Sequence, residues 1–120
     1  MAIRAIRGAT TLTADDAREM SEAVVELVTA MMERNGVVRD DLISILFTAT
    51  PDLHSAFPAA SARDLGLVDV PLICAQELDV TGALPRVVRV LMHTETPLAR
   101  ADVHHIYLRG AEVLRQDLAP

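Results

Sequence analysis

The chain has 120 residues, a length typical of one domain, and we expect residues 1–120 to form it. Apolar residues make up 51% of the sequence, which supplies a buried core and excludes an intrinsically disordered chain. The 11 basic and 17 acidic residues give a net charge of −6, and the aromatic residues are only Phe47, Phe57 and Tyr107. Nucleic acid is therefore not expected as a partner, because its binding needs positive charge and stacking side chains.

The N-terminal third of the chain predicts a strand followed by a long helix. Residues 3–7 alternate in the way a strand does, and Gly8 marks the expected end of that strand. Thr13 and Asp16 resemble a capping box at a helix start. Helical spacing then continues for about six turns, with Gly36 as the closing residue. The apolar residues with this spacing are Ala17, Met20, Val24, Leu27, Val28 and Met31.

The remainder of the chain predicts four strands and a second, shorter helix. Leu42–Ala49 is a nearly continuous apolar run, as in a central strand. A short helix is expected at residues 58–65, before Gly66. Three further strands are expected at 70–76, 86–94 and 104–108, with a last helical turn at 111–114. This order predicts an α+β fold, a mixed five-stranded sheet with one long and one short helix on one face. The other face then needs a cover, which favours association of copies.

The sequence carries no sign of a membrane-spanning segment or a secretory leader. Its apolar runs are far shorter than the roughly 20 residues that cross a bilayer. Arg4 and Arg7 lie inside the first predicted strand, so we expect no leader there. The single cysteine, Cys74, excludes an internal disulfide and suits a reducing compartment. We therefore expect a cytoplasmic protein.

All 11 basic residues are arginine, and the chain contains no lysine. This excludes lysine chemistry such as Schiff bases and pyridoxal phosphate anchoring. Strand alternation places Arg7 and Arg89 on faces that are otherwise apolar, where a guanidinium is costly unless it meets an anion. Two interpretations stay open: a bound anionic ligand, or a structural ion pair with Glu77, Asp79 or a partner subunit.

Other polar residues are individually ambiguous. Glu77 follows a predicted strand and is either a site carboxylate or a solvated loop residue, and Tyr107 is either a cleft hydroxyl or a packed ring. Cys74 has no neighbouring base, no Cys/His spacing matches a metal site, and no glycine-rich phosphate loop is present. We expect no metal and no cofactor. The side chains suit a site that holds a small polyanion and acts through orientation and electrostatics.

Several long motifs occur in an order that resembles a known family. They are IRAIRGATT at the N-terminus, TATPDLHSAFPA from Thr48, CAQELDVTGAL from Cys74, RVLMHT from Arg89 and HHIYLRGAEVLRQDL from His104. From Ile3 to about Leu118 the chain resembles the monofunctional bacterial chorismate mutases of the trimeric mixed α/β type. The resemblance implies a homotrimeric pseudo-barrel with sites between subunits. It also implies the cofactor-free Claisen rearrangement of chorismate to prephenate, in phenylalanine and tyrosine synthesis.

The resemblance also implies roles for individual residues. Arg89 matches an arginine at the ether oxygen and a carboxylate, Arg7 a second site arginine, and Tyr107 a carboxylate-binding phenol. Glu77 and Cys74 match a carboxylate and a thiol at the ring hydroxyl. The rest of the implied lining is Ile73, Ala75 and Gln76, then Phe57 and Arg63 of the neighbouring subunit, and Leu114 and Arg115 of a tail (residues 110–120) that can close over the mouth.

Two departures from the family pattern concern binding. Ala60 stands where the family has a lysine at the pocket mouth, and the connection at residues 65–71 is one residue shorter and lacks aromatic residues.

Two other classes of function remain as alternatives, a trimeric small-carboxylate-binding or enamine/imine-deaminase-like module and a non-catalytic sensor of the aromatic pathway. Glu77 and Arg89 together with Cys74 favour the mutase over both.

Overall fold

A computed structural model of the chain describes residues 1–118. It contains the strands β1 (Ala2–Thr11), β2 (Leu42–Ala49), β3 (Leu72–Gln76), β4 (Val87–Thr96) and β5 (Ile106–Tyr107), and the helices α1 (Ala17–Arg34) and α2 (Pro58–Asp64). Short 3₁₀ segments occupy Arg39–Asp41, Arg100–Asp102 and Ala111–Leu118. The last residues of the predicted tail, 119 and 120, lie outside the described part. No helix in residues 1–118 is long and apolar enough to cross a membrane.

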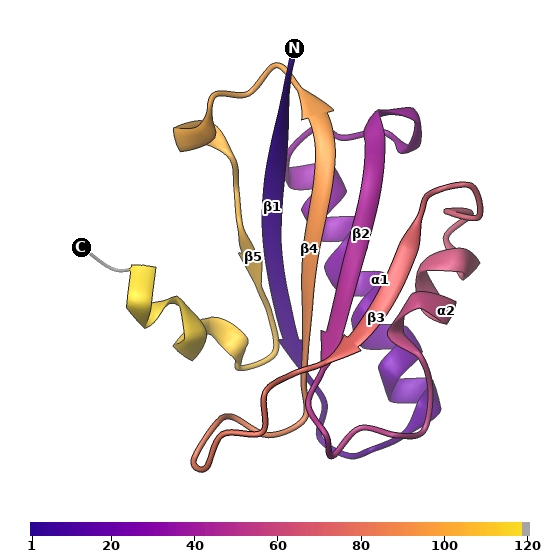
Figure 1. Cartoon of the computed structure of the whole chain (residues 1–120), viewed down its shortest axis with the longest axis vertical. Helices are drawn as coiled ribbons and strands as arrows, with labels where there is room; N and C mark the ends of the chain where they lie inside the picture. Colours follow the sequence, from indigo (N-terminus) through magenta and orange to yellow (C-terminus); the bar gives the residue numbers. More distant parts are fainter. Residues whose placement is uncertain (119–120) are drawn as a thin grey trace.

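The five strands form one mixed sheet in the order β3-β2-β4-β1-β5. The pairs β2–β3 and β1–β5 are parallel, whereas β1–β4 and β2–β4 are antiparallel. Both helices lie on the same face of this sheet, with α1 crossing behind the central strands (Figure 1). The predicted fold class is therefore confirmed.

Helix α1 begins one turn later than predicted, because its N-cap is Asp16 and not Thr13. Asp16 is the N-cap, and its Oδ2 accepts a hydrogen bond of 2.8 Å from the amide of Glu19. The Glu19 carboxylate in turn accepts from the amides of Thr13 and Ala14. The Thr13 amide in particular lowers the pKa of Glu19. The helix spans 18 residues, about five turns rather than six, and ends before Gly36, whose φ of +62° suits a glycine.

The prediction that Gly8 ends the first strand is wrong. Strand β1 continues to Thr11, and Gly8 pairs with Val90 of β4 inside the ladder. A Cβ atom at Gly8 would clash with Sδ of Met31 and lie 3.2 Å from Cδ1 of Leu27. Glycine is needed there because α1 packs directly against the strand backbone, not because the chain turns.

Strand β5 is shorter than its predicted range. The amide of His104 donates to Oδ1 of Asn35 at 2.7 Å, and the Asn35 amide group donates back to the His104 carbonyl. These bonds hold His104 at the C-terminal end of α1. The ladder with β1 therefore starts only at Ile106.

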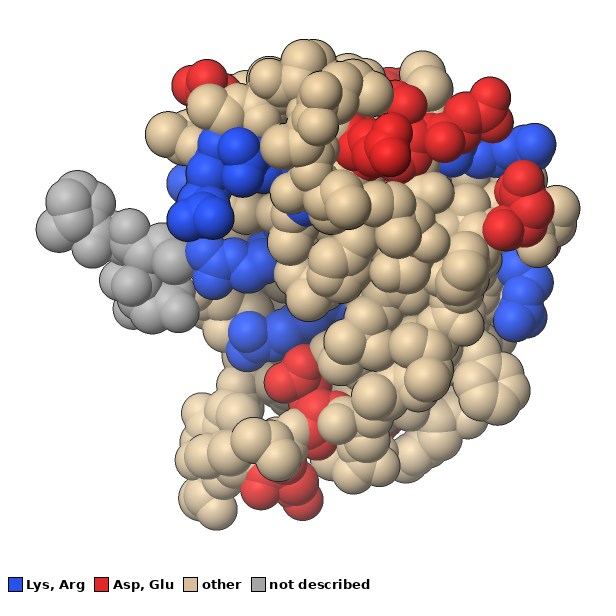
Figure 2. Space-filling view, turned by 45° about the horizontal axis from the view of Figure 1, so that its top comes forward, with Lys and Arg blue, Asp and Glu red and all other residues tan. Residues whose placement is uncertain are grey.

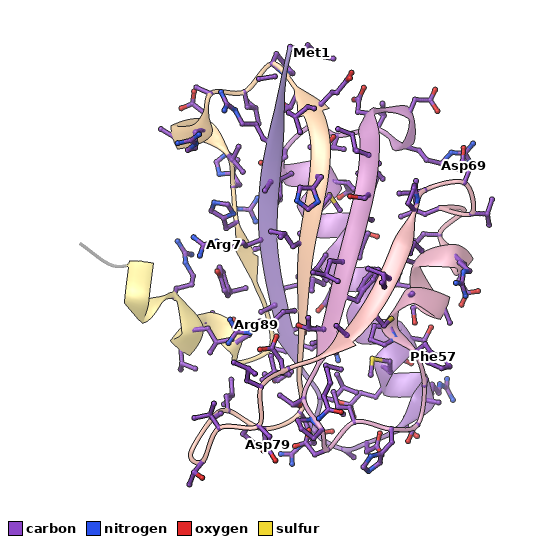
Figure 3. All side chains as sticks on the ribbon, viewed as in Figure 1. Met1, Arg7, Phe57, Asp69, Asp79 and Arg89 are labelled. Atoms are coloured by element: carbon purple, nitrogen blue, oxygen red, sulfur yellow. The ribbon has the colours of Figure 1, made fainter. Side chains whose placement is uncertain are left out.

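The two faces of the sheet differ in cover. On the helix side, alternate residues such as Ile6, Phe47, Val88 and Met92 are fully buried and form one core with α1 and α2. On the opposite side no element formed by residues 1–118 covers most of the sheet, and Ile3 and Ile73 are 63% and 64% exposed. We call this second side the open face. Arg7 and Arg89 project from it (Figure 3).

Candidate active site

A row of side chains crosses the open face. Strand register sets Thr48 of β2 beside Arg89 of β4, Arg89 beside Ala9 of β1, and Ala9 beside Tyr107 of β5. Two residues further along, Leu46, Leu91 and Arg7 form a parallel row. Because Ala9 is small, it leaves a hollow between the long side chains of Arg89 and Tyr107.

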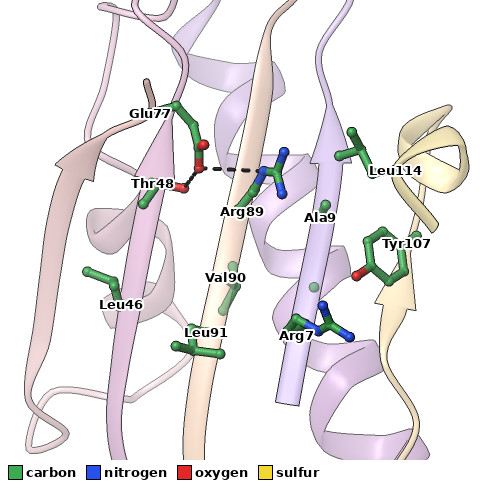
Figure 4. Close-up of a pocket in the computed structure, with 11 residues that line it drawn as sticks. Arg7, Ala9, Leu46, Thr48, Glu77, Arg89, Val90, Leu91, Tyr107 and Leu114 are labelled. Carbon is green, nitrogen blue, oxygen red and sulfur yellow. Dashed lines mark hydrogen bonds and ion pairs between the residues drawn. The ribbon is translucent and has the colours of Figure 1, made fainter. Parts of the chain in front are cut away.

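This hollow is a cleft of about 200 Å³ (Figure 4). Charged and hydroxyl side chains lie around its rim, while apolar residues and strand backbone form its floor. Its lining residues are Arg7, Gly8, Ala9, Leu46, Thr48, Glu77, Arg89, Val90, Leu91, Tyr107 and Leu114. The structure thus brings together five residues singled out from the sequence, namely Arg7, Glu77, Arg89, Tyr107 and Leu114.

Arg89 and Glu77 form an ion pair at one end of the cleft. Nε of Arg89 lies 3.5 Å from Oε2 of Glu77, and the Thr48 hydroxyl donates to that same oxygen. The Glu77 amide donates to the carbonyl of Ala49 at 2.9 Å, which fixes the carboxylate just beyond the end of β3. Of the ion-pair partners that the sequence left open for Arg89, the structure selects Glu77.

The ion pair leaves binding capacity toward the cleft. Within the described part of the chain, Nη1 and Nη2 of Arg89 and Oε1 of Glu77 have no hydrogen-bond partner. The guanidinium points from β4 toward β1 (Figure 4). Arg89 is 50% exposed and Glu77 23% exposed. Arg89 shares its strand face with Val87 and Leu91 as predicted. Its guanidinium is nevertheless half exposed in the single chain, because no helix of residues 1–118 covers that face.

Arg7 and Tyr107 stand at the other end of the cleft. The Tyr107 hydroxyl turns toward the Arg7 side chain (Figure 4), and within the described residues the Arg7 guanidinium has no hydrogen-bond partner. The guanidinium of Arg115 lies over the Tyr107 ring, 5.7 Å from its centroid. Basic side chains gather in a column on this side of the molecule although the net charge is −6 (Figure 2). Such a column attracts anions to the cleft.

The remaining predicted site residues lie elsewhere in the single chain. Phe57, Cys74, Ala75 and Gln76 line a second groove, between β3 and the loop that leads into α2. Phe57 is 73% exposed in that groove. Ile73 is on the exposed edge strand and Arg63 is exposed on α2. Cys74 packs against the helix-side core, so within one chain its thiol is not beside Glu77.

Two residues that contact the site, one in the cleft lining and one beside it, were not singled out from the sequence. Thr48 belongs to the motif that starts TATPDL, yet its contact with Glu77 depends on the pairing of β2 with β3. The sequence patterns assign no role to His105, beyond the absence of a metal-binding Cys/His spacing. Its Nδ1 accepts a hydrogen bond of 2.9 Å from the backbone amide of Arg7. No periodicity within one strand indicates such a contact, because it depends on the register between two strands.

No group of three or more His, Cys, Asp or Glu side chains within the described residues is placed to hold a metal ion. The arrangement instead offers two guanidinium groups, a phenol and a carboxylate around an apolar floor. These groups can bind carboxylates and stabilise negative charge that develops between them.

Comparison with known proteins identifies the family. Residues 3–118 match the sequence model of chorismate mutase type I. Chorismate mutase AroH of Bacillus subtilis is 42% identical over 99% of this chain and 94% of the relative, and its Thermus thermophilus counterpart is 47% identical over 97% and 96%. A solved chorismate mutase from Clostridium thermocellum superposes with a TM-score of 0.90 at 45% identity, over 92% of this chain and 98% of that one. The chain therefore belongs to the chorismate mutase type I family.

Proposed function

We propose that this chorismate mutase converts chorismate to prephenate through Arg89, with Glu77, Arg7 and Tyr107 holding the substrate. The observation that carries the proposal is the Arg89–Glu77 pair at a small cleft with an apolar floor. The Nη atoms of Arg89 have no hydrogen-bond partner among residues 1–118 and are directed toward that cleft. In this pericyclic reaction the ether C–O bond breaks ahead of C–C bond formation, so negative charge grows on the ether oxygen. A fixed guanidinium at that oxygen stabilises the transition state more than the ground state.

Glu77 has a double role in this proposal. Its Oε2 is engaged by Arg89 and Thr48, which fixes the orientation of the guanidinium. Its Oε1 is left to accept a hydrogen bond from the ring hydroxyl of the substrate. One carboxylate thus aligns the catalytic cation and one end of the ligand.

Arg7 and Tyr107 bind a substrate carboxylate in this scheme, and Arg115 adds positive charge beside Tyr107. Because the two ends of the cleft hold opposite ends of a flexible substrate, they favour the compact chair-like conformer in which the reacting carbons meet. No proton transfer or covalent intermediate is required of the protein.

A homotrimer with sites between subunits accounts for the residues outside the cleft. The cleft of about 200 Å³ is smaller than the roughly 300–1,000 Å³ of typical ligand pockets. The open face beside it exposes Ile3 and Ile73, which an apolar contact with another copy would bury. In this arrangement Phe57, Arg63 and Cys74 complete the cleft of a neighbouring chain. The single cysteine of the sequence supports a cytoplasmic location.

The activity is tested by following the loss of chorismate absorbance, with purified protein against a protein-free control. We expect loss well above the spontaneous rate, insensitive to a chelator and retained in Cys74→Ser. Binding of chorismate without accelerated loss would instead identify a non-catalytic sensor.

Assembly is tested separately by light scattering at micromolar concentration. We expect the mass of three chains. A monomeric mass together with full activity would contradict the shared site.

A further inference from the structure

We propose that His105 is a positioning residue of the substrate cleft, whose neutral ring holds the start of β5 against Arg7 and so fixes Tyr107 opposite the Arg7 guanidinium. This inference rests on the proposed function of the cleft. It goes beyond it by assigning a role to a side chain that does not line the cleft.

The first observation is the place of His105 in the ladder. Backbone pairing between β1 and β5 covers only Gly8 with Ile106 and Ala9 with Tyr107, followed by a bond of 2.9 Å from the Leu108 amide to the Ala9 carbonyl. One residue before this pairing starts, Nδ1 of His105 accepts a hydrogen bond of 2.9 Å from the backbone amide of Arg7. The His105 side chain therefore extends the β1–β5 ladder, in which only two residue pairs are joined through the backbone.

The second observation is which strand this contact fixes. β1 is paired along all its residues with the ten-residue strand β4, and Arg7 itself pairs with Leu91. β5 has two residues and lies at the edge of the sheet. The hydrogen bond therefore restrains β5 more than β1. The side chain that depends on it is Tyr107, two residues after His105.

The third observation is electrostatic. Because Nδ1 accepts a hydrogen bond, the neutral imidazole ring carries its own proton on Nε2. The charged groups around the ring are all cationic within the described residues: Arg7 from β1, Arg115 from the last 3₁₀ segment, and Arg4 and Arg100 across a shared cavity. Burial and the charges of Arg7 and Arg115 lower the pKa of His105 below its ordinary value of about 6.5.

Protonation of His105 removes the acceptor, because Nδ1–H would face the Arg7 amide proton. It also adds a positive charge beside the four arginines. β5 then loses its extra restraint, and Tyr107 no longer stays opposite Arg7. Because these two side chains bind a carboxylate present in both ground and transition states, the effect falls on KM more than on kcat.

The kinetic test compares wild type with His105→Gln, His105→Phe and the control His104→Gln between pH 5 and 8. The adjacent His104 is exposed and is held by its backbone, which makes it a matched control. We expect kcat/KM of the wild type and of His104→Gln to fall toward the acid end of this range, as His105 takes up a proton. His105→Gln, a neutral acceptor that does not titrate, should keep the wild-type KM at pH 7.5 and lose this acid limb. His105→Phe should raise KM about two- to tenfold at every pH, with kcat within about twofold.

The contact is tested independently of activity by an NMR titration of the histidine rings. We expect the pKa of His105 to lie below its ordinary value and its neutral form to be protonated on Nε2. An ordinary pKa, or a neutral form protonated on Nδ1, overturns the contact whether or not the protein consumes chorismate. A lowered pKa with an acid limb that persists in His105→Gln overturns the positioning role. Failure of wild type to consume chorismate would count against the proposed function alone.

Discussion

The two faces of the sheet differ in what they carry: one holds the buried core, and the other holds the cleft that we propose as the active site. Phe47, Val88 and Met92 point to the helices and are fully buried, while their immediate neighbours Leu46 and Arg89 point to the open face. Alternation along the same strands thus supplies both the core and the cleft. A substitution in a strand should therefore affect stability if its side chain faces the helices, and catalysis if it faces the cleft. Substitutions of individual residues can test this division.

The largest effect is expected at Arg89 on the open face. Loss of one preorganised donor typically reduces the rate by about 10²–10³, or roughly 2.7–4 kcal/mol. We expect Arg89→Ala to exceed that loss in kcat, because Glu77 is left unbalanced and the chain has no lysine to compensate. Arg89→Lys should recover little, since it lacks the planar fork that spans two oxygens.

The control for Arg89→Ala is its thermal unfolding, which should stay close to wild type because Arg89 is half exposed and contributes little to the core. Retention of more than about a tenth of the wild-type kcat, a deficit below about 1.4 kcal/mol, would make this arginine structural.

The neighbouring residues Phe47 and Leu46 test directly whether one face of the sheet serves stability and the other serves substrate binding. Phe47→Ala should lower the free energy of unfolding by about 3–5 kcal/mol, the usual effect of emptying a fully buried aromatic site. Its kcat should remain within about twofold below the unfolding transition. Leu46→Ala, on the cleft side, should destabilise less and raise KM more. Equal effects of both changes in denaturant titrations and kinetics would contradict the division.

A smaller effect is expected at Thr48. Thr48→Val removes the hydroxyl that donates to Oε2 of Glu77 while keeping the shape of the side chain. We expect kcat/KM to fall about three- to tenfold, from the loss of one hydrogen bond that aligns a charged group. Thr48→Ser restores the donor and should restore most of the activity. No rescue by serine would mean that the methyl group, not the hydroxyl, matters.

The smallest effect is expected at Ala60, which is exposed on α2 and does not line the cleft of its own chain. If a neighbouring copy completes the cleft, Ala60→Lys brings a cation to its mouth. KM for the dianionic substrate should then fall about two- to threefold and depend more steeply on salt, with kcat unchanged. Ala60→Gln is the matched uncharged control. A KM that Ala60→Lys leaves unchanged would place α2 away from every cleft.

The sequence by itself determined the succession of elements, because each rests on local patterns. Alternation in β1, the continuous apolar run of β2 and the helical spacing of α1 each depend on residues close together in the chain. The family followed in the same way, from motifs read along the chain. Local patterns also misled at Gly8, where the reason for glycine is a contact with Met31 more than twenty positions away.

Only the tertiary structure decided what surrounds each functional side chain. Strand register placed Thr48, Arg89, Ala9 and Tyr107 in one row, and it turned Cys74 away from Glu77 toward the core. The bond from Arg7 to His105 joins positions 98 residues apart. Such contacts have no local signature, since pairing between strands is set by how the whole sheet closes over its helices. The sequence therefore predicted the groups that we propose for the chemistry, and the fold determined which residues surround them.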